Sequence, residues 1–257
     1  MLTINRRKKL GIRFDEIYFV DDYKLALTDA DLSVVIFSKN HPTNIPYKEK
    51  GNIGIDLRQE GDEIFNGFTK SFRQDIRNSI HDHYFTIERH TNPSIEEQLM
   101  FCEYFNEFSR QKGIHTITRN NLKHLIDANA FLYTKLLDAH TGKPLCFLTY
   151  ILHNNRASGQ FGCSHFRVEA KSAERNKIGK ANKYLHYHNM LYLKEQGYTF
   201  YDFGGYHTDE SGRPLTGIDQ FKLYFGGIPF KEYAFFYPRT FVGKLMLFIK
   251  KKHVEDL

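Results

Sequence analysis

The chain has 257 residues, 41% of them hydrophobic and 15% aromatic, which is enough to fill the core of one large domain or two small ones and predicts a globular protein. A net charge of +6 and a pI near 9.0 favour anionic partners such as phosphates, coenzyme, nucleotide sugars, lipid-linked sugars or tRNA, without choosing among them. No window approaches 18 uninterrupted apolar residues, which excludes a membrane-spanning helix.

The cysteine spacing and the first residues of the sequence indicate in which cellular compartment the protein is expected. Cys102, Cys146 and Cys163 lie far apart, without the spacing of a metal site or a disulfide framework. The first residues, MLTINRRKKLG, lack the apolar stretch of a signal peptide. We therefore expect a cytoplasmic protein without a metal, with a position at the inner membrane surface left open.

Residues 1–83 predict a small half-domain rich in strands. The runs FDEIYFV, KLALTD, LSVVIF and NIGIDL have the β-branched and aromatic content of strands. A helix is expected over 67–81, GFTKSFRQDIRNSIH.

From residue 84 the expected elements become regular. Tyr84 to His90 alternates like a strand, and the segment 93–113 has apolar residues at helical spacing before Gly113. A second short helix is expected from Arg119 to Ala128. Three consecutive antiparallel strands should follow, at Phe131 to Ala139, Leu145 to His153 and Ala157 to Phe166.

The next expected element is a long central helix, which Gly197 ends and whose apolar face includes Leu185 and Leu191. A strand at Tyr198 to Phe203, a short helix over 217–225 and a final strand over 230–237 complete the order. From residue 84 the predicted order is therefore β, α, α, β, β, β, α, β, α, β.

Residues 241–257 predict a basic C-terminal helix. Apolar residues between Phe241 and His253 alternate with four lysines, at positions 244, 250, 251 and 252. A helix packed on the domain with a solvated basic face is the first interpretation, and peripheral contact with anionic lipid is the alternative.

Two segments carry a resemblance to a known family. The segment YDFGGYHTDESGRPLTGIDQFKLYFGG, 201–227, resembles the closing signature of the FemAB group, in which a YDFGG-like strand end precedes a GI..FK..FGG block. The segment FTKSFRQDIRNS, 68–79, is similar to the Arg-rich helix upstream in that group. The resemblance covers roughly residues 50–240 and places the chain in the FemAB-like branch of the GNAT acyltransferase superfamily.

The resemblance implies an α/β (α+β) fold of the GNAT type, in which helices flank a mixed, mostly antiparallel sheet. The expected domains are a truncated N-terminal GNAT-like half-domain at 1–83, an acyltransferase domain at 84–240 and the helix at 241–257. Long members of the group carry two complete halves and a helical arm associated with tRNA, and this chain is too short for both.

In the wider fold, the coenzyme pyrophosphate binds backbone amides at the start of the central helix, in a loop of pattern Q/R-x-x-G-x-G/A. Asn176 to Ala181 fits this pattern as N-x-x-G-x-A. Small residues would let the main chain approach the phosphates, and the free helix end supplies donors and a positive dipole. The candidate cofactor-binding residues are Arg175, Lys177, Gly179, Lys180, Ala181 and Asn182.

Acyl transfer to an amine requires a route for the amine proton and donors for the carbonyl oxygen as it becomes negative. By resemblance, Lys222 would orient the acceptor or stabilise that charge. Asp202 could accept a proton or simply fix a turn, and His207 has a suitable intrinsic pKa for a proton shuttle. Tyr224 could protonate the leaving thiolate or ribose oxygen, or only pack in the core.

Four further residues are candidates for substrate binding. Arg73 and Arg77 lie four residues apart on one predicted helix face, so both guanidiniums could grip a phosphate or diphosphate. Tyr201 ends the strand before the signature loop, and Asp209 lies within that loop.

The sequence thus predicts an N-acyltransferase that moves an acyl group from acyl-CoA, as co-substrate, to an amino group of a sugar nucleotide or of a cell-envelope or polysaccharide precursor. The acceptor would be a small-molecule or lipid-linked amine. Two alternatives stay open: a FemAB-type transferase that takes its residue from aminoacyl-tRNA, and a non-catalytic module that binds a nucleotide sugar or a partner. The oligomeric state is not predicted.

Overall fold

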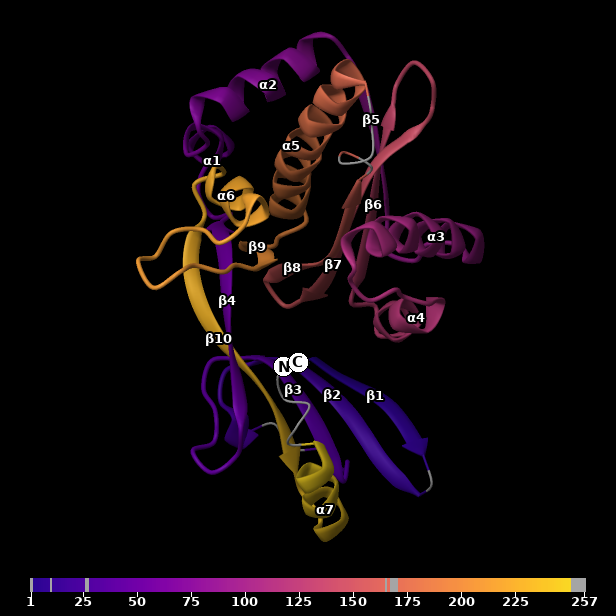
Figure 1. The fold of residues 1–257 in the computed structure, drawn as a ribbon, viewed down its shortest axis with the longest axis vertical. Coiled ribbons are helices and arrows are strands. Elements are labelled where there is room, and N and C mark those ends of the chain that lie inside the picture. The colour runs from indigo at the N-terminus through magenta and orange to yellow at the C-terminus, as the bar shows by residue number, and fades with distance from the viewer. Residues whose placement is uncertain (1, 10, 26–27, 165, 167–170, 251–257) are drawn as a thin grey trace. The chain divides into compact units, whose positions relative to one another are not determined.

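The computed structural model describes residues 2–9, 11–25, 28–164, 166 and 171–250. These form two compact units (Figure 1). The first unit combines residues 1–53, 205–214 and 229–257, and the second combines residues 54–204 and 215–228. These units are defined by contacts between residues and do not test the predicted domain boundaries at 83/84 and 240/241, which stay a prediction.

In its described residues, the first unit is a small set of paired strands with one α-helix and one 3-10 helix. β1 (Leu2–Lys9) pairs antiparallel with β2 (Ile12–Val20), which runs parallel to β3 (Leu32–Ser38). β3 pairs antiparallel with β10 (Ile228–Pro238), and β4 (Tyr47–Asp56) is the next strand. Ile17, Val20, Val35 and Phe235 form the core of this sheet.

One local prediction in this unit is corrected, and one strand was not predicted. The run KLALTD, 24–29, was expected as a strand, but its first two residues are the end of the 3-10 helix η1 (Tyr23–Leu25), residues 26–27 lie outside the described set, and 28–29 are not in a strand. β1 was not expected from the sequence, because its charged run gives no alternation. The predicted C-terminal helix is present as α7 (Phe241–Lys250), and residues 251–257 lie outside the described part.

The second unit carries most of the expected elements. A meander of β5 (Phe85–His90), β6 (Phe131–Asp138), β7 (Pro144–His153) and β8 (Arg156–Ser164) is antiparallel throughout. β8 then pairs in parallel with β9 (Phe200–Gly205), and the end of β4 follows β9 in the strand order. A parallel pair needs a long crossover, which α5 (Ser172–Glu195) supplies.

Helices cover both faces of this sheet. Phe147 of β7 packs on Phe101 of α3 (Ile95–Lys112), whereas Tyr150 of the same strand meets Asn189 of α5. Because 147 and 150 differ by an odd number, their side chains point to opposite faces. α4 (Arg119–Asp127) contacts β6, and α2 (Lys70–His81) contacts α5. The remaining helices are α1 (Gly61–Asn66) and α6 (Gly217–Leu223).

The glycines of the signature have a structural reason. Gly226 has a φ of +73°, and a Cβ there would lie 2.5 Å from the Gly67 carbonyl oxygen. Gly204 has a φ of +74°, and its Cβ would lie 2.8 Å from the Gly159 carbonyl oxygen. The glycines of YDFGG and FGG therefore allow close backbone contacts that fix the ends of β9 and α6.

We expect Gly226→Ala to destabilise the protein by at least about 1–3 kcal/mol, because Ala would combine a left-handed backbone with a clash against main-chain oxygen. Gly217→Ala is the matched control, since no atom lies within 4 Å of a Cβ at that position. Urea unfolding of both variants checks this, and equal midpoints would refute the steric explanation.

Candidate functional site

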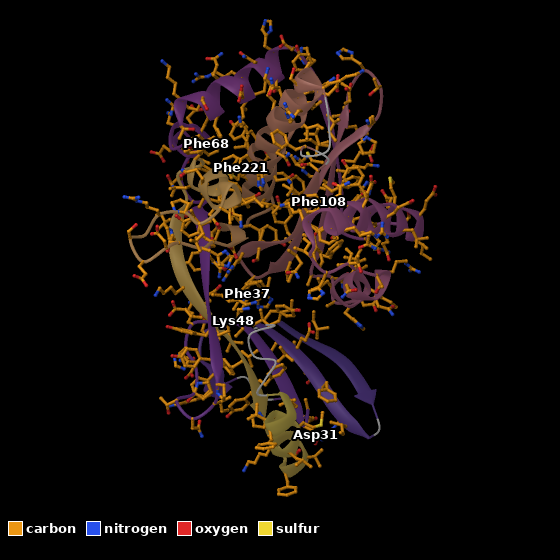
Figure 2. The ribbon with its side chains drawn as sticks, viewed as in Figure 1. Asp31, Phe37, Lys48, Phe68, Phe108 and Phe221 are labelled. Atoms are coloured by element: carbon orange, nitrogen blue, oxygen red, sulfur yellow. The ribbon has the colours of Figure 1, made fainter. Side chains whose placement is uncertain are left out.

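The structure places Lys222 near the C-terminal end of α6, in a half-buried position. It follows Phe221, which is labelled in Figure 2. α6 is anchored at its other end, where Asp219 Oδ2 accepts a hydrogen bond of 2.6 Å from Thr216 Oγ1 and Thr216 Oγ1 accepts one of 3.2 Å from the Asp219 amide. Burial lowers the pKa of Lys222, while the carboxylates of Asp202 and Asp219 oppose that shift. The ammonium is thus partly desolvated and balanced by two carboxylates.

Asp202 lies on β9 with no exposed surface. Its Oδ2 accepts bonds of 2.5 Å each from Arg156 Nη2 and Ser158 Oγ, and its Oδ1 accepts the Gly204 amide at 2.8 Å. With three donors and no path to solvent, this carboxylate joins β8 to β9 and fixes the turn at Gly204. Its position favours the turn-fixing interpretation over direct proton transfer to a substrate.

His186 of α5 was not among the predicted site residues. Its Nδ1 lies 2.6 Å from the Tyr201 hydroxyl, and its ring packs against the rings of Phe203, Phe221 and Phe225. Burial, with a smaller contribution from the Lys222 charge, lowers the pKa of His186 to about 3. The imidazole is therefore neutral near pH 7.

A chain of polar side-chain contacts continues from His186 to residues of β9, β7, α5 and β5. The Tyr201 hydroxyl lies 2.7 Å from the Tyr150 hydroxyl, and Asn189 Nδ2 donates to Tyr150 at 3.1 Å. Arg89 Nε donates to Asn189 Oδ1 at 3.0 Å. All of these groups lie in the second unit, on β5, β7, α5 and β9.

One end of this chain has a fixed direction. A guanidinium only donates, so Asn189 presents its oxygen to Arg89 and its amide hydrogens to Tyr150. Between Tyr150 and Tyr201 either hydroxyl can be the donor, and the direction between Tyr201 and His186 Nδ1 follows the tautomer of the ring. A neutral His186 satisfies this contact either as the acceptor or as the donor at Nδ1.

Acidification should therefore destabilise the protein partly through His186. Below pH 6.5 an unfolded chain protonates this histidine, whereas the folded form stays neutral down to about pH 3. Stability is then lost as the pH falls from about 7 to 4, and His186 contributes roughly 1–3 kcal/mol of that loss. We expect His186→Asn to flatten this dependence, measured by urea unfolding at each pH. The exposed His115→Asn serves as control, and an equal slope in both variants would contradict the assignment.

The predicted coenzyme loop does not lie at a helix start. α5 begins at Ser172, so the amides of Gly179, Ala181 and Asn182 lie within the helix, several residues past its N-terminus. The amides left without intrahelical partners belong to the first turn, so the expected helix start at 176–182 is wrong, while coenzyme binding by these residues stays a prediction. The helix start was predicted too late because glycine is typical of loops, whereas Gly179 lies inside the helix.

The side chains of this segment have described contacts of their own. Lys177 pairs with Asp138, and Asn182 Nδ2 donates to Ile178 O at 3.1 Å. Ala181 is fully buried. Lys180 helps to lower the pKa of Asp82, after the hydrogen bond from His81. Arg175 lies half-buried one turn into the helix.

Arg73 and Arg77 share α2 as predicted, but their contacts are internal. Arg73 Nη1 donates to the carbonyl oxygens of Asn66 at 2.7 Å and Phe68 at 2.6 Å, so it caps the end of α1. The Arg77 guanidinium lies 5.1 Å from the centre of the Phe65 ring. Joint binding of a diphosphate stays a prediction.

The remaining predicted residues are dispersed. Tyr201 is fully buried in the polar chain described above, and Tyr224 is exposed at the end of α6 with its ring 5.4 Å from that of Phe72. His207 and Asp209 are exposed and belong to the first unit. Asp209 Oδ1 accepts bonds from the amides of Ser211 and Arg213, which shapes its loop.

One group in the described ranges has metal-type ligands, formed by Glu88, His90 and Glu97, whose ligand atoms all lie within 4.8 Å of one another. These side chains already have other partners. Glu88 is paired with Lys135 at 2.7 Å, and Glu97 accepts the Ser94 amide at 2.7 Å. A nearby ammonium opposes cation binding, so the group fits an internal polar cluster better than a metal site.

Comparison with solved structures defines the fold class. The chain superposes on FemX with a TM-score of 0.64 and 14% identity, over 96% of this chain and 85% of FemX. L-PGS from Bacillus licheniformis gives a TM-score of 0.54 at 14% identity, over 88% and 74% of the two chains. The C-terminal DUF2156 domain of a candidate lysylphosphatidylglycerol synthetase from Agrobacterium fabrum gives 0.54 at 13% identity, over 84% and 70%.

These matches confirm the predicted fold, which this chain shares with FemX and with L-PGS. Neither a protein-family model nor a curated protein sequence matches the chain. Within the described ranges, no helix has the length and apolar character needed to cross a bilayer.

Proposed function

We propose that this protein transfers an acyl or aminoacyl unit to an amine, and that the Lys222 ammonium stabilises the carbonyl oxygen of the transferred unit. The observation that carries the proposal is the position of Lys222. It is half-buried, its ammonium is influenced by Asp202 and Asp219, and it lies in a fold shared with FemX. A cation in such a setting acts more strongly on developing charge than one in water.

The reaction requires a neutral amine that attacks the carbonyl carbon while the oxygen takes up the electron pair. Collapse of the tetrahedral intermediate reforms the carbonyl and expels the donor's sulfur or ribose oxygen, which takes a proton in balance with the one that the amine loses. Lys222 would bind the negative oxygen, and no covalent enzyme intermediate is needed. Tyr224, exposed at the end of α6, remains the candidate to protonate the leaving group.

The donor is better explained as an aminoacyl ester of tRNA than as acyl-CoA. The sequence argument for coenzyme rested on free amides at 176–182, and α5 already includes these residues. FemX is matched over most of both chains, and the FemAB group implies an aminoacyl-tRNA donor. The positive net charge agrees with a polyanionic donor. Acyl-CoA stays the second donor to test.

The acceptor we propose is an amino group on a cell-envelope precursor, either a sugar nucleotide or a lipid-linked intermediate. The resemblance to the FemAB group supports this acceptor. A non-catalytic module that binds a nucleotide sugar is the rival from another class, and the desolvated ammonium of Lys222 argues against it because a pure binding surface gains little from burying a lysine.

Two steps distinguish these possibilities. First, the protein is purified without nuclease and its bound material is analysed by absorbance and mass, where we expect tRNA and not coenzyme. Second, labelled aminoacyl-tRNA and labelled acyl-CoA are each offered with a panel of amines. Transfer from aminoacyl-tRNA alone supports the proposal, transfer from acyl-CoA alone replaces the donor, and an absence of transfer from either contradicts the enzymatic function.

A further inference from the structure

The outer face of α7 is apolar and exposed. Phe241 is 83% exposed, Leu245 59% and Phe248 75%. At about 100° per residue, these three side chains fall within an arc of roughly 60° on one side of the helix. Isolated exposed apolar residues are common, but three large ones on one face form a continuous surface.

The opposite face of α7 holds the helix in a fixed orientation on the first unit. Met246 and Leu247 pack against Leu32 and Phe236. A Cβ at Gly243 would lie 1.8 Å from the carbonyl oxygen of Asp31, the residue labelled beside α7 in Figure 2. The helix backbone therefore lies directly on the start of β3.

The first turn of α7 is held in addition by Thr240. Its Oγ1 accepts the Gly243 amide at 3.1 Å and donates to Asp31 Oδ1 at 2.9 Å. Because the inner face is anchored and capped, α7 holds its outer face away from the sheet of the first unit. Among the described residues this apolar surface is left exposed.

We propose that this face binds the surface of an anionic lipid bilayer, with α7 lying in the plane of the interface. The exposed Lys244 flanks the apolar arc, roughly 60° from Phe241 around the helix. Lys250, Lys251 and Lys252 follow in the sequence, the last two outside the described residues, and the chain as a whole carries +6.

This combination is that of an interfacial helix, whose aromatic and aliphatic face enters the boundary between headgroups and acyl chains by roughly 5–10 Å while its cations meet acidic headgroups. A second copy of the chain would bring its own lysines to the same rim, where the like charges would repel. The charge pattern therefore favours an anionic membrane over self-association.

The test is sedimentation of the full chain with vesicles of phosphatidylcholine alone and with vesicles that also contain phosphatidylglycerol. We expect binding to the anionic vesicles, which high salt weakens. The partition coefficient of the triple variant Phe241→Ser, Leu245→Ser, Phe248→Ser should fall at least about tenfold. Each change removes apolar area that the wild-type helix would bury in the bilayer. Lys244→Glu should reduce binding to anionic vesicles only.

The matched control is Ile95→Ser with Leu99→Ser, which removes two exposed apolar residues from α3 in the other unit and should leave binding unchanged. Thermal unfolding shows whether each variant is folded. Failure of the wild-type chain to bind anionic vesicles, or unchanged binding by the folded triple variant, would overturn the proposal. A concentration-dependent dimer that the triple variant abolishes would also overturn it, in favour of pairing between copies.

Discussion

We expect the Lys222→Met variant to lose about 100-fold in kcat/KM for acyl transfer while its urea midpoint stays close to that of the wild type. Loss of one preorganised group that stabilises an oxyanion has an effect of this order. Removing a half-buried ammonium also removes its desolvation cost, so stability should change little. Steady-state transfer kinetics and urea unfolding measure the two quantities.

Lys194→Met is the matched control, because this lysine of α5 is also partly buried and its Nζ donates to Leu57 O at 3.2 Å. Its turnover should remain near that of the wild type. A Lys222→Met variant with full turnover would remove Lys222 from the mechanism, and equal losses in both variants would indicate a general effect of losing a lysine.

The pH dependence gives Lys222 a second signature. Burial lowers its pKa, so the ammonium is lost at a lower pH than for an ordinary lysine, and turnover should fall on the alkaline side at that lower pH. A guanidinium keeps its charge, so Lys222→Arg should move this alkaline limb to higher pH even if its maximal rate is reduced. An unchanged limb would mean that another group controls it.

The second large effect concerns Asp202. Asp202→Ala should destabilise the protein by about 3–5 kcal/mol, because it leaves the side chain of Arg156, only 14% exposed, without its carboxylate partner. The double variant with Arg156→Met should recover part of that loss, since the guanidinium that lost this carboxylate is then gone as well. Urea unfolding of the two single variants and the double variant measures the coupling.

Asp202→Asn separates the structural role from a catalytic one. The amide keeps acceptor capacity while removing the charge that raises the pKa of Lys222, so the alkaline limb of turnover should move to lower pH. If Asp202 were the proton acceptor, turnover would instead be abolished at every pH with stability intact. That outcome would contradict the position described for this carboxylate.

The order of elements after residue 84 could be predicted from the sequence, and the structure confirms it. Gly and Pro residues between the expected elements indicated where each one ends, as Gly113 does after α3 and Gly197 does after α5. The start of α5 could not be read in the same way, because a glycine inside a helix looks like a loop residue. The predicted binding of coenzyme by free backbone amides at 176–182 depended on that boundary.

The site was only partly predictable. Lys222 and Asp202 lie in the signature, so their neighbourhood was found from local sequence alone. The row of polar contacts from Arg89 to His186 was not predicted, because its members come from four elements that only the folded structure brings together. His186 was visible in the sequence, but the signal for its role is the ring packing that desolvates it, which no spacing rule reports.

The measurement that tests the central claim most directly is a single-turnover experiment with labelled aminoacyl-tRNA, in which excess protein meets limiting donor and an amine acceptor. We predict that the wild-type chain forms an amide product at a rate at least tenfold above that of Lys222→Ala, with equal donor binding by the two proteins. Equal rates in the two proteins, or product that forms without the protein at the same rate, would contradict the role of the Lys222 ammonium in acyl transfer.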